Sequence, residues 1–127
     1  IVHRRHGRYV LRLVKARLSI DDTEHASKTA NLEQVIKGGA VVITGGTGGL
    51  GLHVADNLAN HGATNLVLLS RTGAQSDRAM VMIESLRQRN VNVQVIQVDV
   101  TKKEVLETLD WVNDHVAPIA IIIHTAG

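Results

Sequence analysis

The sequence predicts an α/β fold in which a parallel β-sheet is covered by helices on both faces. From residue 40 onward, short and almost fully apolar stretches alternate with amphipathic stretches, a pattern typical of parallel strands buried on both sides. The glycine-rich stretch TGGTGGLG at 44–51 directly follows the first apolar stretch, as it does in doubly wound sheets. We therefore expect the first half of such a sheet, about four parallel strands with three helices.

The region before this sheet reads differently. A short apolar run at 9–14 is broken by Arg12, and a polar stretch follows from Ser19 to about Asn31. Short apolar runs indicate strands and polar stretches indicate linkers. We therefore interpret residues 1–37 as the last strand of an upstream structural subdomain plus a linker, and residues 38–127 as the sheet-forming domain.

The first three elements of the sheet-forming domain are a strand, a helix and a strand at short spacing. AVVIT at 40–44 and NLVLL at 65–69 are compact apolar runs, as expected of buried strands. Between them, residues 50–59 form a helix rich in small residues. A second helix follows, capped by Ser76 or Asp77, and its buried stripe has the i, i+3, i+4, i+7 spacing: Ala79, Met82, Ile83 and Leu86.

The third and fourth strands flank the last helix. Alternating valines begin the third strand at Val91, and it continues to Asp99. Thr101 and Glu104 have the spacing of a capping box, which predicts the start of a helix whose apolar stripe is Val105, Leu109, Val112 and Val116. Pro118 ends this helix, and residues 119–123 form the fourth strand.

Composition restricts the classes of protein to consider. A chain of 127 residues with 44% hydrophobic content can bury a core. No apolar run approaches the roughly 18 residues that cross a bilayer, so no membrane partner is expected. The chain has no cysteine, which rules out disulfides and thiolate metal sites and fits the cytoplasm. Since it begins at Ile1 and ends within an apolar run, we interpret it as a fragment.

Positive charge is concentrated at the start of the chain. Residues 1–19 contain six Arg or Lys and no acid, so the remaining 8 basic and 12 acidic residues give residues 20–127 a net charge of 8 − 12 = −4. A basic arm could bind nucleic acid or phospholipid. A solvated strand with its flanks is the alternative that we favour, because aromatic residues that could stack on bases make up only 2% of the chain.

The glycine-rich stretch predicts a phosphate site of the Rossmann type. Gly46, Gly48 and Gly51 satisfy G-x-G-x-x-G between a strand and a helix. The first glycine permits a tight turn, the second lets the backbone approach a pyrophosphate, and the third lets helix and strand pack closely. The helix that begins near Gly49 would direct free amides and its positive dipole end at the phosphates. A P-loop is excluded because this loop contains no lysine.

The end of the second strand indicates which dinucleotide binds. An acid about 20 residues after the glycines would accept from a ribose 2′-hydroxyl, but Arg71 occupies that place and no acid lies between Asp56 and Asp77. A guanidinium suits a 2′-phosphate, which favours NADP(H) over NAD(H). An arginine that merely extends into solvent is the alternative. The missing acid also argues against a methyltransferase.

Two further polar residues end predicted strands. Asp99 could accept a hydrogen bond from an adenine amino group, or it could cap the helix expected near Thr101. His124 follows the fourth strand, and we interpret it as a packing residue rather than a general acid or base. The other histidines show no ligand spacing and no accompanying carboxylate pair, so no metal is expected.

Together these residues resemble the short-chain dehydrogenase/reductase superfamily, and most closely the ketoreductase (KR) domains of polyketide synthases and animal-type fatty acid synthases. The matching stretches are TGGTGGLG at 44–51 with Ala55, HGATNLVLLSRTG at 61–73, VDVT at 98–101 and IIIHTAG at 121–127. GRYVLRL at 7–13 resembles the strand that closes the structural subdomain upstream of the catalytic half.

The resemblance implies which residues would bind the cofactor. The glycine loop would hold the pyrophosphate, Ser70 and Arg71 the 2′-phosphate, Asp99 and Val100 the adenine, and Ala126 and Gly127 the ribose nearer the nicotinamide. The residues expected in the loop are Thr44, Gly45, Gly46, Thr47, Gly48, Gly49, Leu50 and Gly51.

The resemblance also implies a reaction. In this family NADPH reduces a β-ketoacyl group, carried on the phosphopantetheine arm of an acyl carrier protein, to a β-hydroxyacyl group. The family's catalytic Ser, Tyr and Lys would lie beyond Gly127, and the single tyrosine here is Tyr9. We therefore expect a cofactor-binding part of the reductase, with neighbouring synthase domains as partners. A degenerate, non-catalytic reductase domain and a free-standing reductase of a small carbonyl compound are the alternatives.

Overall fold

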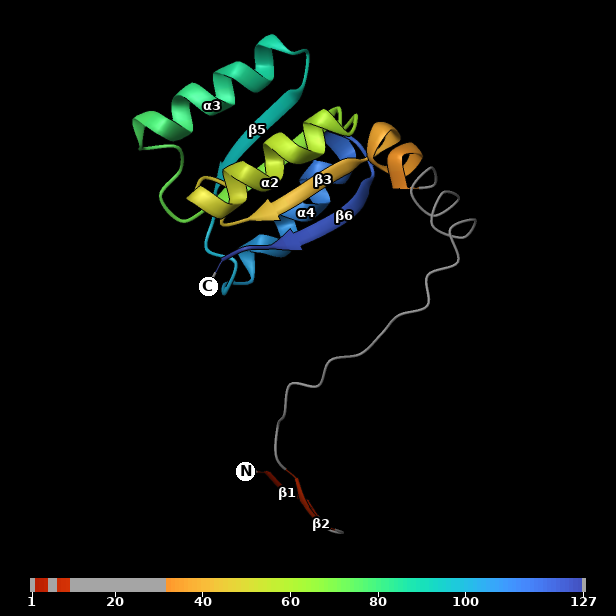
Figure 1. Cartoon of the computed structure of the whole chain (residues 1–127), viewed down its shortest axis with the longest axis vertical. Coiled ribbons are helices and arrows are strands. Elements are labelled where there is room, and N and C mark those ends of the chain that lie inside the picture. Colours follow the sequence, from red (N-terminus) through yellow and green to blue (C-terminus); the bar gives the residue numbers. More distant parts are fainter. Residues whose placement is uncertain (1, 5–6, 10–31, 127) are drawn as a thin grey trace.

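The computed structural model describes residues 2–4, 7–9 and 32–126. Residues 32–126 form an α/β unit in which strands and helices alternate (Figure 1). A helical segment at 32–38 precedes the first strand of this unit. The elements that follow are β3 (Ala40–Thr44), α2 (Gly49–Asn60), β4 (Asn65–Ser70), α3 (Asp77–Gln88), β5 (Asn92–Gln97), α4 (Glu104–His115) and β6 (Ile119–His124).

The four strands of this unit form one parallel sheet in the order β5-β4-β3-β6. Thr44, the last residue of β3, is in register with Leu69 of β4 and His124 of β6. The carboxyl ends of the strands therefore meet at one edge of the sheet. The predicted α/β, Rossmann-type parallel sheet is confirmed.

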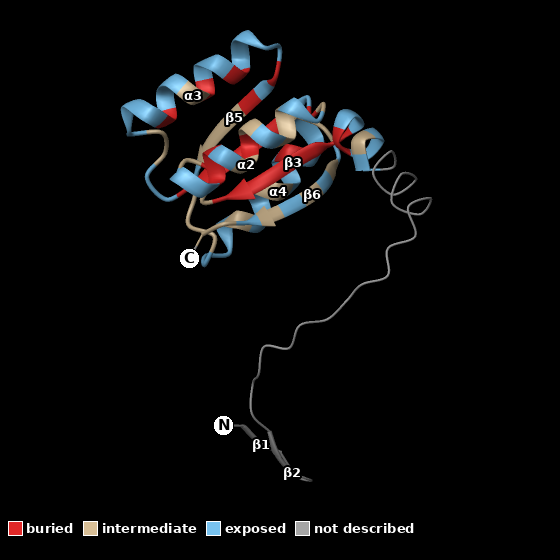
Figure 2. Cartoon of the chain, in the orientation of Figure 1, coloured by how far each residue is buried: buried red, intermediate tan, exposed pale blue. Residues whose placement is uncertain are grey.

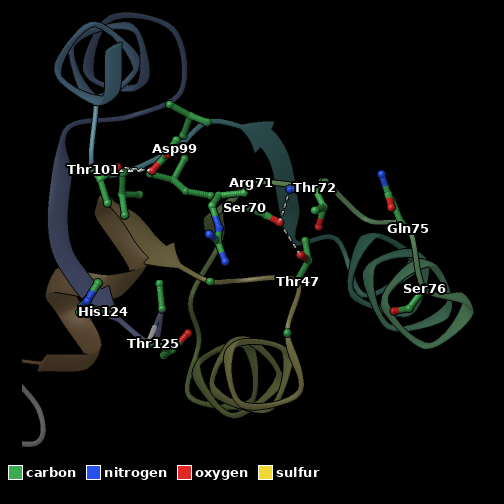
Figure 3. Close-up of a pocket in the computed structure, with 17 residues that line it drawn as sticks. Thr47, Ser70, Arg71, Thr72, Gln75, Ser76, Asp99, Thr101, His124 and Thr125 are labelled. Atoms are coloured by element: carbon green, nitrogen blue, oxygen red, sulfur yellow. Dashed lines mark hydrogen bonds between the residues drawn. The ribbon is translucent and has the colours of Figure 1, made fainter. Parts of the chain in front are cut away.

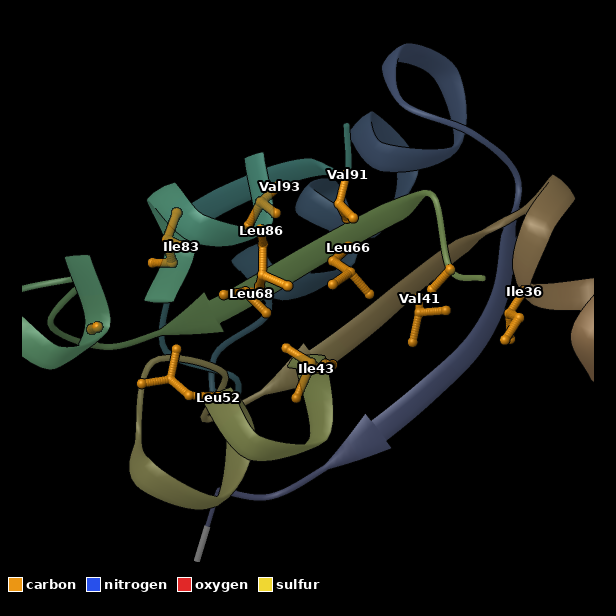
Figure 4. Packing of buried hydrophobic residues seen from close by; sticks show 13 residues of the cluster. Ile36, Val41, Ile43, Leu52, Leu66, Leu68, Ile83, Leu86, Val91 and Val93 are labelled. Carbon is orange, nitrogen blue, oxygen red and sulfur yellow. The ribbon is translucent and has the colours of Figure 1, made fainter. Parts of the chain in front are cut away.

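Helices cover both faces of the sheet, as predicted. On one face, side chains of β3, β4 and β5 pack against α2 and α3 (Figure 4); the buried residues of this cluster are Ile36, Val41, Ile43, Leu52, Ala55, Ala63, Leu66, Leu68, Ala79, Ile83, Leu86, Val91 and Val93. On the other face a smaller cluster packs against α4: Ala40, Val42, Val67, Leu69 and Val112. Side chains alternate between the two faces along each strand, so all five residues of β3 are buried (Figure 2).

Strand β6 differs from β3 in burial. Its residues alternate between half-buried and exposed, and Ile122 is 54% exposed. Within residues 32–126, β6 pairs with β3 on one side only, which leaves its other edge and part of one face open.

The start of α4 corrects one prediction. Thr101 and Glu104 do not form a capping box, because α4 begins only at Glu104 and its N-cap is Lys103, two residues after Thr101. The helix has no side-chain cap, and the Thr101 hydroxyl donates its proton to Asp99 Oδ1 at 2.7 Å. The preceding strand also ends earlier than predicted, at Gln97 rather than Asp99. The other helix cap is confirmed, since Ser76 Oγ accepts from Ala79 N at 3.1 Å at the start of α3.

The region before β3 contains structure that the sequence did not indicate. Ile36, within the helical segment at 32–38, belongs to the larger core cluster. Further upstream, β1 (Val2–Arg4) and β2 (Gly7–Tyr9) form an antiparallel pair. The strand expected at 9–14 lies outside the described residues beyond Tyr9. The division at residues 37 and 38 remains a prediction. Among the helices of the described residues, none combines the length and apolarity required to cross a bilayer.

Candidate functional site

A pocket of about 730 Å³ lies at the carboxyl edge of the sheet, where the loops after β3, β4, β5 and β6 meet (Figure 3). Ligand sites in open α/β sheets occupy this edge. The lining residues are Gly45, Thr47, Gly48, Leu69, Ser70, Arg71, Thr72, Gly73, Gln75, Ser76, Val98, Asp99, Val100, Thr101, His124, Thr125 and Ala126.

The tight turn after β3 is made by a different glycine from the one predicted. Gly45 has φ +66°, and a Cβ there would approach Ala126 N to 2.8 Å, so only glycine fits this position. Gly46 has no positive φ. A Cβ on Gly46 would instead meet the Leu68 Cβ at 2.7 Å, so its missing side chain serves packing of the loop on β4.

The N-terminus of α2 has backbone N–H groups without a partner in the helix. The N-cap is Gly48, no side chain caps the helix, and no acid lies in its first turn. Leu52 N is bonded to Gly48 O at 2.9 Å, and the three amides before it, at 49–51, lie too early in the helix to have an i−4 partner within it. An anion could accept hydrogen bonds from these N–H groups, and the positive end of the helix dipole would favour it.

Gly51 lets α2 approach the loop this closely. A Cβ on Gly51 would collide with Gly45 O and would lie 2.7 Å from Gly46 Cα. The predicted close packing is therefore present, but the helix packs on the loop rather than on a strand.

The end of β4 brings two predicted residues to the pocket. Ser70 is only 8% exposed, and its Oγ accepts from Thr47 Oγ1 at 2.8 Å and from Thr72 N at 3.3 Å. Arg71 is exposed, and Figure 3 shows its guanidinium within the ring of lining residues. Its backbone is fixed because Gln97 Nε2 donates to Arg71 O at 3.0 Å. The Arg71 guanidinium and the Ser70 hydroxyl thus both border the pocket.

Asp99 lies opposite this end of β4, in the loop after β5. Its Oδ1 accepts from Thr101 Oγ1 at 2.7 Å and from Thr101 N at 2.9 Å. The Thr101 side chain and then its backbone N–H lower the pKa of Asp99, burial opposes them, and Lys102 and Arg71 lower it further. Asp99 is therefore a carboxylate acceptor that closes the turn before α4. It does not cap a helix at Thr101.

Side-chain hydrogen bonds join the end of β6 to the end of β3. Thr44 Oγ1 lies 2.6 Å from His124 Nδ1, and Thr125 Oγ1 donates to Thr44 O at 2.6 Å. Thr44 is only 7% exposed and lies beneath the pocket rather than in its lining. This agrees with a packing role for His124, although its ring also borders the pocket. Ala126 lines the pocket, and Gly127 lies outside the described residues.

The structure thus brings most of the expected residues together. Those that line the pocket are Gly45, Thr47, Gly48, Ser70, Arg71, Asp99, Val100 and Ala126. Gly46 and Gly51 are buried behind the loop, whereas Gly49 and Leu50 are exposed at the start of α2, outside the lining.

The sequence analysis did not place seven lining residues in the site: Leu69, Thr72, Gly73, Gln75, Ser76, Val98 and Thr101. Leu69 lies near the end of β4 and the other six lie in the loops after β4 and β5. This position is the signal that could have found them, since the carboxyl edge of a parallel sheet lines its crevice. His124, the last residue of β6, and Thr125 after it also line the pocket, as their place at the end of the fourth strand indicates. Over residues 2–4, 7–9 and 32–126, no group of three or more His, Asp or Glu is placed to hold a metal ion.

Comparison with known proteins shows the family of this chain. The KR domain family model matches residues 39–127. The chain is 46% identical over 68 residues, 54% of its length, to the highly reducing polyketide synthase alnA of Emericella nidulans. It is 34% identical over 125 residues, 98% of its length, to the erythronolide synthase EryA3 of Saccharopolyspora erythraea. The chain spans only 3% and 4% of these two proteins.

A solved structure shares both the fold and the sequence pattern. PlmKR1, the ketoreductase from the first module of phoslactomycin biosynthesis in Streptomyces sp. HK803, superposes with a TM-score of 0.64 at 37% identity. The match covers 70% of this chain and 21% of that one. The glycine loop, the open helix end and these matches together show that the chain belongs to the KR domain family, the ketoreductase domains of polyketide synthases.

Proposed function

We propose that this chain carries the NADP(H)-binding part of a β-ketoacyl reductase in a polyketide synthase. The reaction would convert a β-ketoacyl group on an acyl carrier protein to a β-hydroxyacyl group. One observation carries the proposal: the uncapped N-terminus of α2 lies beside a pocket that also contains Arg71. A dinucleotide with a third phosphate needs both groups.

The donor set of the pocket fits such a cofactor. The amides at the start of α2 would receive the pyrophosphate, and Arg71 with Ser70 would hold the 2′-phosphate. Asp99, kept ionised, offers an acceptor for the adenine amino group beside Val100. Ala126 and Gly127 would border the ribose nearer the nicotinamide. The absence of an acid at position 71 favours NADP(H), because a carboxylate there would repel the 2′-phosphate.

The bound cofactor would supply the hydride, and this chain's residues would bind and orient it. Reduction of a ketone also needs a proton donor, and general acid help is typically worth about 10²–10⁴-fold in rate. We assign this proton donor to none of residues 1–127. The family's donor is a tyrosine, and the single tyrosine of this chain, Tyr9, precedes the glycine loop. We expect the catalytic Ser, Tyr and Lys after Gly127.

The size of the relatives suggests the partners of this chain. The relatives are polyketide synthases, and this chain covers only a few per cent of their length. This supports the proposal that neighbouring synthase domains and an acyl carrier protein are its partners. We propose the cytoplasm as the location, because the chain contains no cysteine.

Replacing Arg71 tests the cofactor assignment. The complete protein is titrated with NADPH and with NADH. Arg71→Ala should weaken the binding of NADPH by about 1.5–3 kcal/mol, the value of a hydrogen bond to a charged group, and leave the binding of NADH nearly unchanged.

Arg89→Ala is the matched control, because Arg89 is bonded to Asp56 at 2.7 Å and does not line the pocket. This variant should leave the affinity for both cofactors unchanged. Equal losses for NADPH and NADH in Arg71→Ala would refute the 2′-phosphate assignment.

A further inference from the structure

Two hydroxyl groups connect the glycine loop to the end of β4. Thr47 belongs to the loop between β3 and α2, and Ser70 is the last residue of β4. Thr47 Oγ1 donates to Ser70 Oγ at 2.8 Å, and Figure 3 shows this bond at the side of the pocket, close to Arg71. Both residues line the pocket, and Ser70 is 8% exposed.

The bonds around Ser70 fix what its hydroxyl can still do. A serine hydroxyl has one proton to donate and two lone pairs that accept. Ser70 Oγ already accepts from Thr47 Oγ1 and from Thr72 N, the latter at 3.3 Å. When Thr47 is the donor of this pair, both acceptor positions of Ser70 are filled, and Ser70 can interact with a ligand only as a donor. Thr47 then offers a ligand only its lone pairs.

Which of the two hydroxyl groups donates matters when the ligand is a phosphate monoester. A phosphate monoester carries about 1.5–2 negative charges at neutral pH, and its oxygens accept hydrogen bonds. Ser70 as a donor suits such an oxygen, whereas a Ser70 hydroxyl that donated back to Thr47 would present only lone pairs to it. A ribose 2′-hydroxyl can donate or accept, so it is indifferent to this choice.

We propose that Thr47 is a positioning residue for cofactor selectivity: it holds the Ser70 hydroxyl as a donor toward the 2′-phosphate of NADP(H). This inference rests on the proposed function, since it presumes that the pocket binds this cofactor. It assigns Thr47 a role separate from pyrophosphate binding by the loop. Loss of the Thr47 hydroxyl therefore acts on NADPH through Ser70 and leaves NADH unaffected.

Thr47→Val removes the hydroxyl and keeps the branched shape of the side chain. In calorimetric titrations of the complete protein, we expect Thr47→Val to weaken NADPH and 2′,5′-ADP about 5-fold, the effect of one neutral hydrogen bond. NADH and 5′-AMP should change by less than about 2-fold, because they lack the 2′-phosphate. Thr47→Ser, which keeps the hydroxyl, should restore NADPH affinity.

Ser70→Ala tests whether Thr47 acts through Ser70. This variant alone should weaken NADPH about 10-fold or more, since it removes a donor to a charged group. In the Ser70→Ala background, Thr47→Val should add less than about 2-fold, because residues that act through one bond are not additive. Thr64→Val is the matched control, since its hydroxyl donates to Lys37 O outside the pocket, and it should leave both affinities unchanged.

Three outcomes would overturn the inference and leave the proposed cofactor standing. Equal losses of NADPH and NADH in Thr47→Val would show a structural role for the loop hydroxyl. If Thr47→Val weakened NADPH binding by the same factor in the Ser70→Ala background as in the wild type, Thr47 would contact the cofactor independently of Ser70. An unchanged NADPH affinity in Thr47→Val, with Arg71→Ala still selective, would refute the role of Thr47 alone. If the wild type does not prefer NADPH, the proposed cofactor itself is wrong, and the inference fails with it.

Discussion

Helices α2 and α3 both begin at the carboxyl edge of the sheet, yet their N-termini are built differently. The cap residues have similar extended backbones, with φ −78° and ψ 169° at Gly48 and φ −81° and ψ 146° at Ser76. Ser76 accepts from Ala79 N, and Asp77 adds an acid to the first turn of α3. Helix α2 has neither a capping side chain nor an acid. The difference therefore lies in side-chain chemistry and not in backbone geometry.

This comparison separates a helix end with a capping side chain from one without. Glycine at an N-cap stabilises a helix by only about a few tenths of a kcal/mol less than a capping side chain does, so α2 loses little by having Gly48 there. A phosphate at the helix end would offset the loss, since an anion there is typically worth about 0.3–1 kcal/mol. The open end of α2 is therefore where we propose that the pyrophosphate of the cofactor binds.

The largest effect should come from adding a single methyl group behind the open helix end. Gly51→Ala places a Cβ against Gly45 O and Gly46 Cα, so we expect the free energy of unfolding to fall by about 1–3 kcal/mol. Thermal or denaturant unfolding of the cofactor-free protein measures this.

The same substitution two residues earlier is the control. A Cβ on Gly49 would meet nothing within 4 Å, so Gly49→Ala should stabilise the helix by about 0.5–1 kcal/mol. If Gly51→Ala were as well tolerated as Gly49→Ala, the close packing of loop and helix would be refuted.

A smaller effect should follow from giving α2 the acid that α3 already has. Gly49→Asp places a carboxylate in the first turn of α2, where the dipole favours it by about 0.3–1 kcal/mol. The cofactor-free protein should gain stability, while affinity for NADPH and NADH should fall together because the carboxylate repels the pyrophosphate.

Gly49→Asn separates charge from size, since it has nearly the same shape and no charge. It should keep most of the cofactor affinity that Gly49→Asp loses. Equal binding losses in the two variants would mean that bulk, and not charge, blocks the site.

The smallest effect concerns the turn before α4, where the Thr101 hydroxyl donates to Asp99 Oδ1. The pKa of Asp99 is lowered chiefly by the Thr101 side chain. The stabilisation that accompanies this shift is therefore present at neutral pH and is lost as the pH falls through the lowered pKa. Thr101→Val should raise the pKa of Asp99 in an NMR titration of its carboxyl group.

Lys102→Gln provides the comparison for this titration. The charge of Lys102 lowers the pKa of Asp99 less than the hydrogen bonds of Thr101 do, so its removal should raise the pKa of Asp99 by a smaller amount. A larger change in Lys102→Gln than in Thr101→Val would show that charge, not hydrogen bonding, controls Asp99.

Much of the fold and part of the candidate site could be predicted from residue order. The apolar runs became β3, β4 and β6 almost at the predicted residues. For β3 and β4 the reason is that burial on both faces leaves little choice of side chain. Ser76 caps α3 as predicted, because its cap bond joins residues only three positions apart. Arg71 could be placed because the spacing from the glycines to the second strand is set by one helix.

Contacts between distant segments could not be predicted in this way. Ile36 reads as part of a linker, and only the packed core shows that it is buried. The capping box predicted at Thr101 is wrong because α4 begins only at Glu104, which leaves Thr101 two residues before the N-cap Lys103. Spacing alone does not show at which residue the helix begins.

The sequence by itself determined that a strand, a glycine loop and a helix follow one another, and that a cation ends the next strand. Tertiary structure decided which glycine takes the positive φ, because Gly45 is pressed against Ala126, a residue far along the chain. It also decided that Thr47 meets Ser70 and that Thr44 meets His124. The physical reason is the strand order: placing β3 between β4 and β6 brings three loops to one edge, and no local pattern encodes that arrangement.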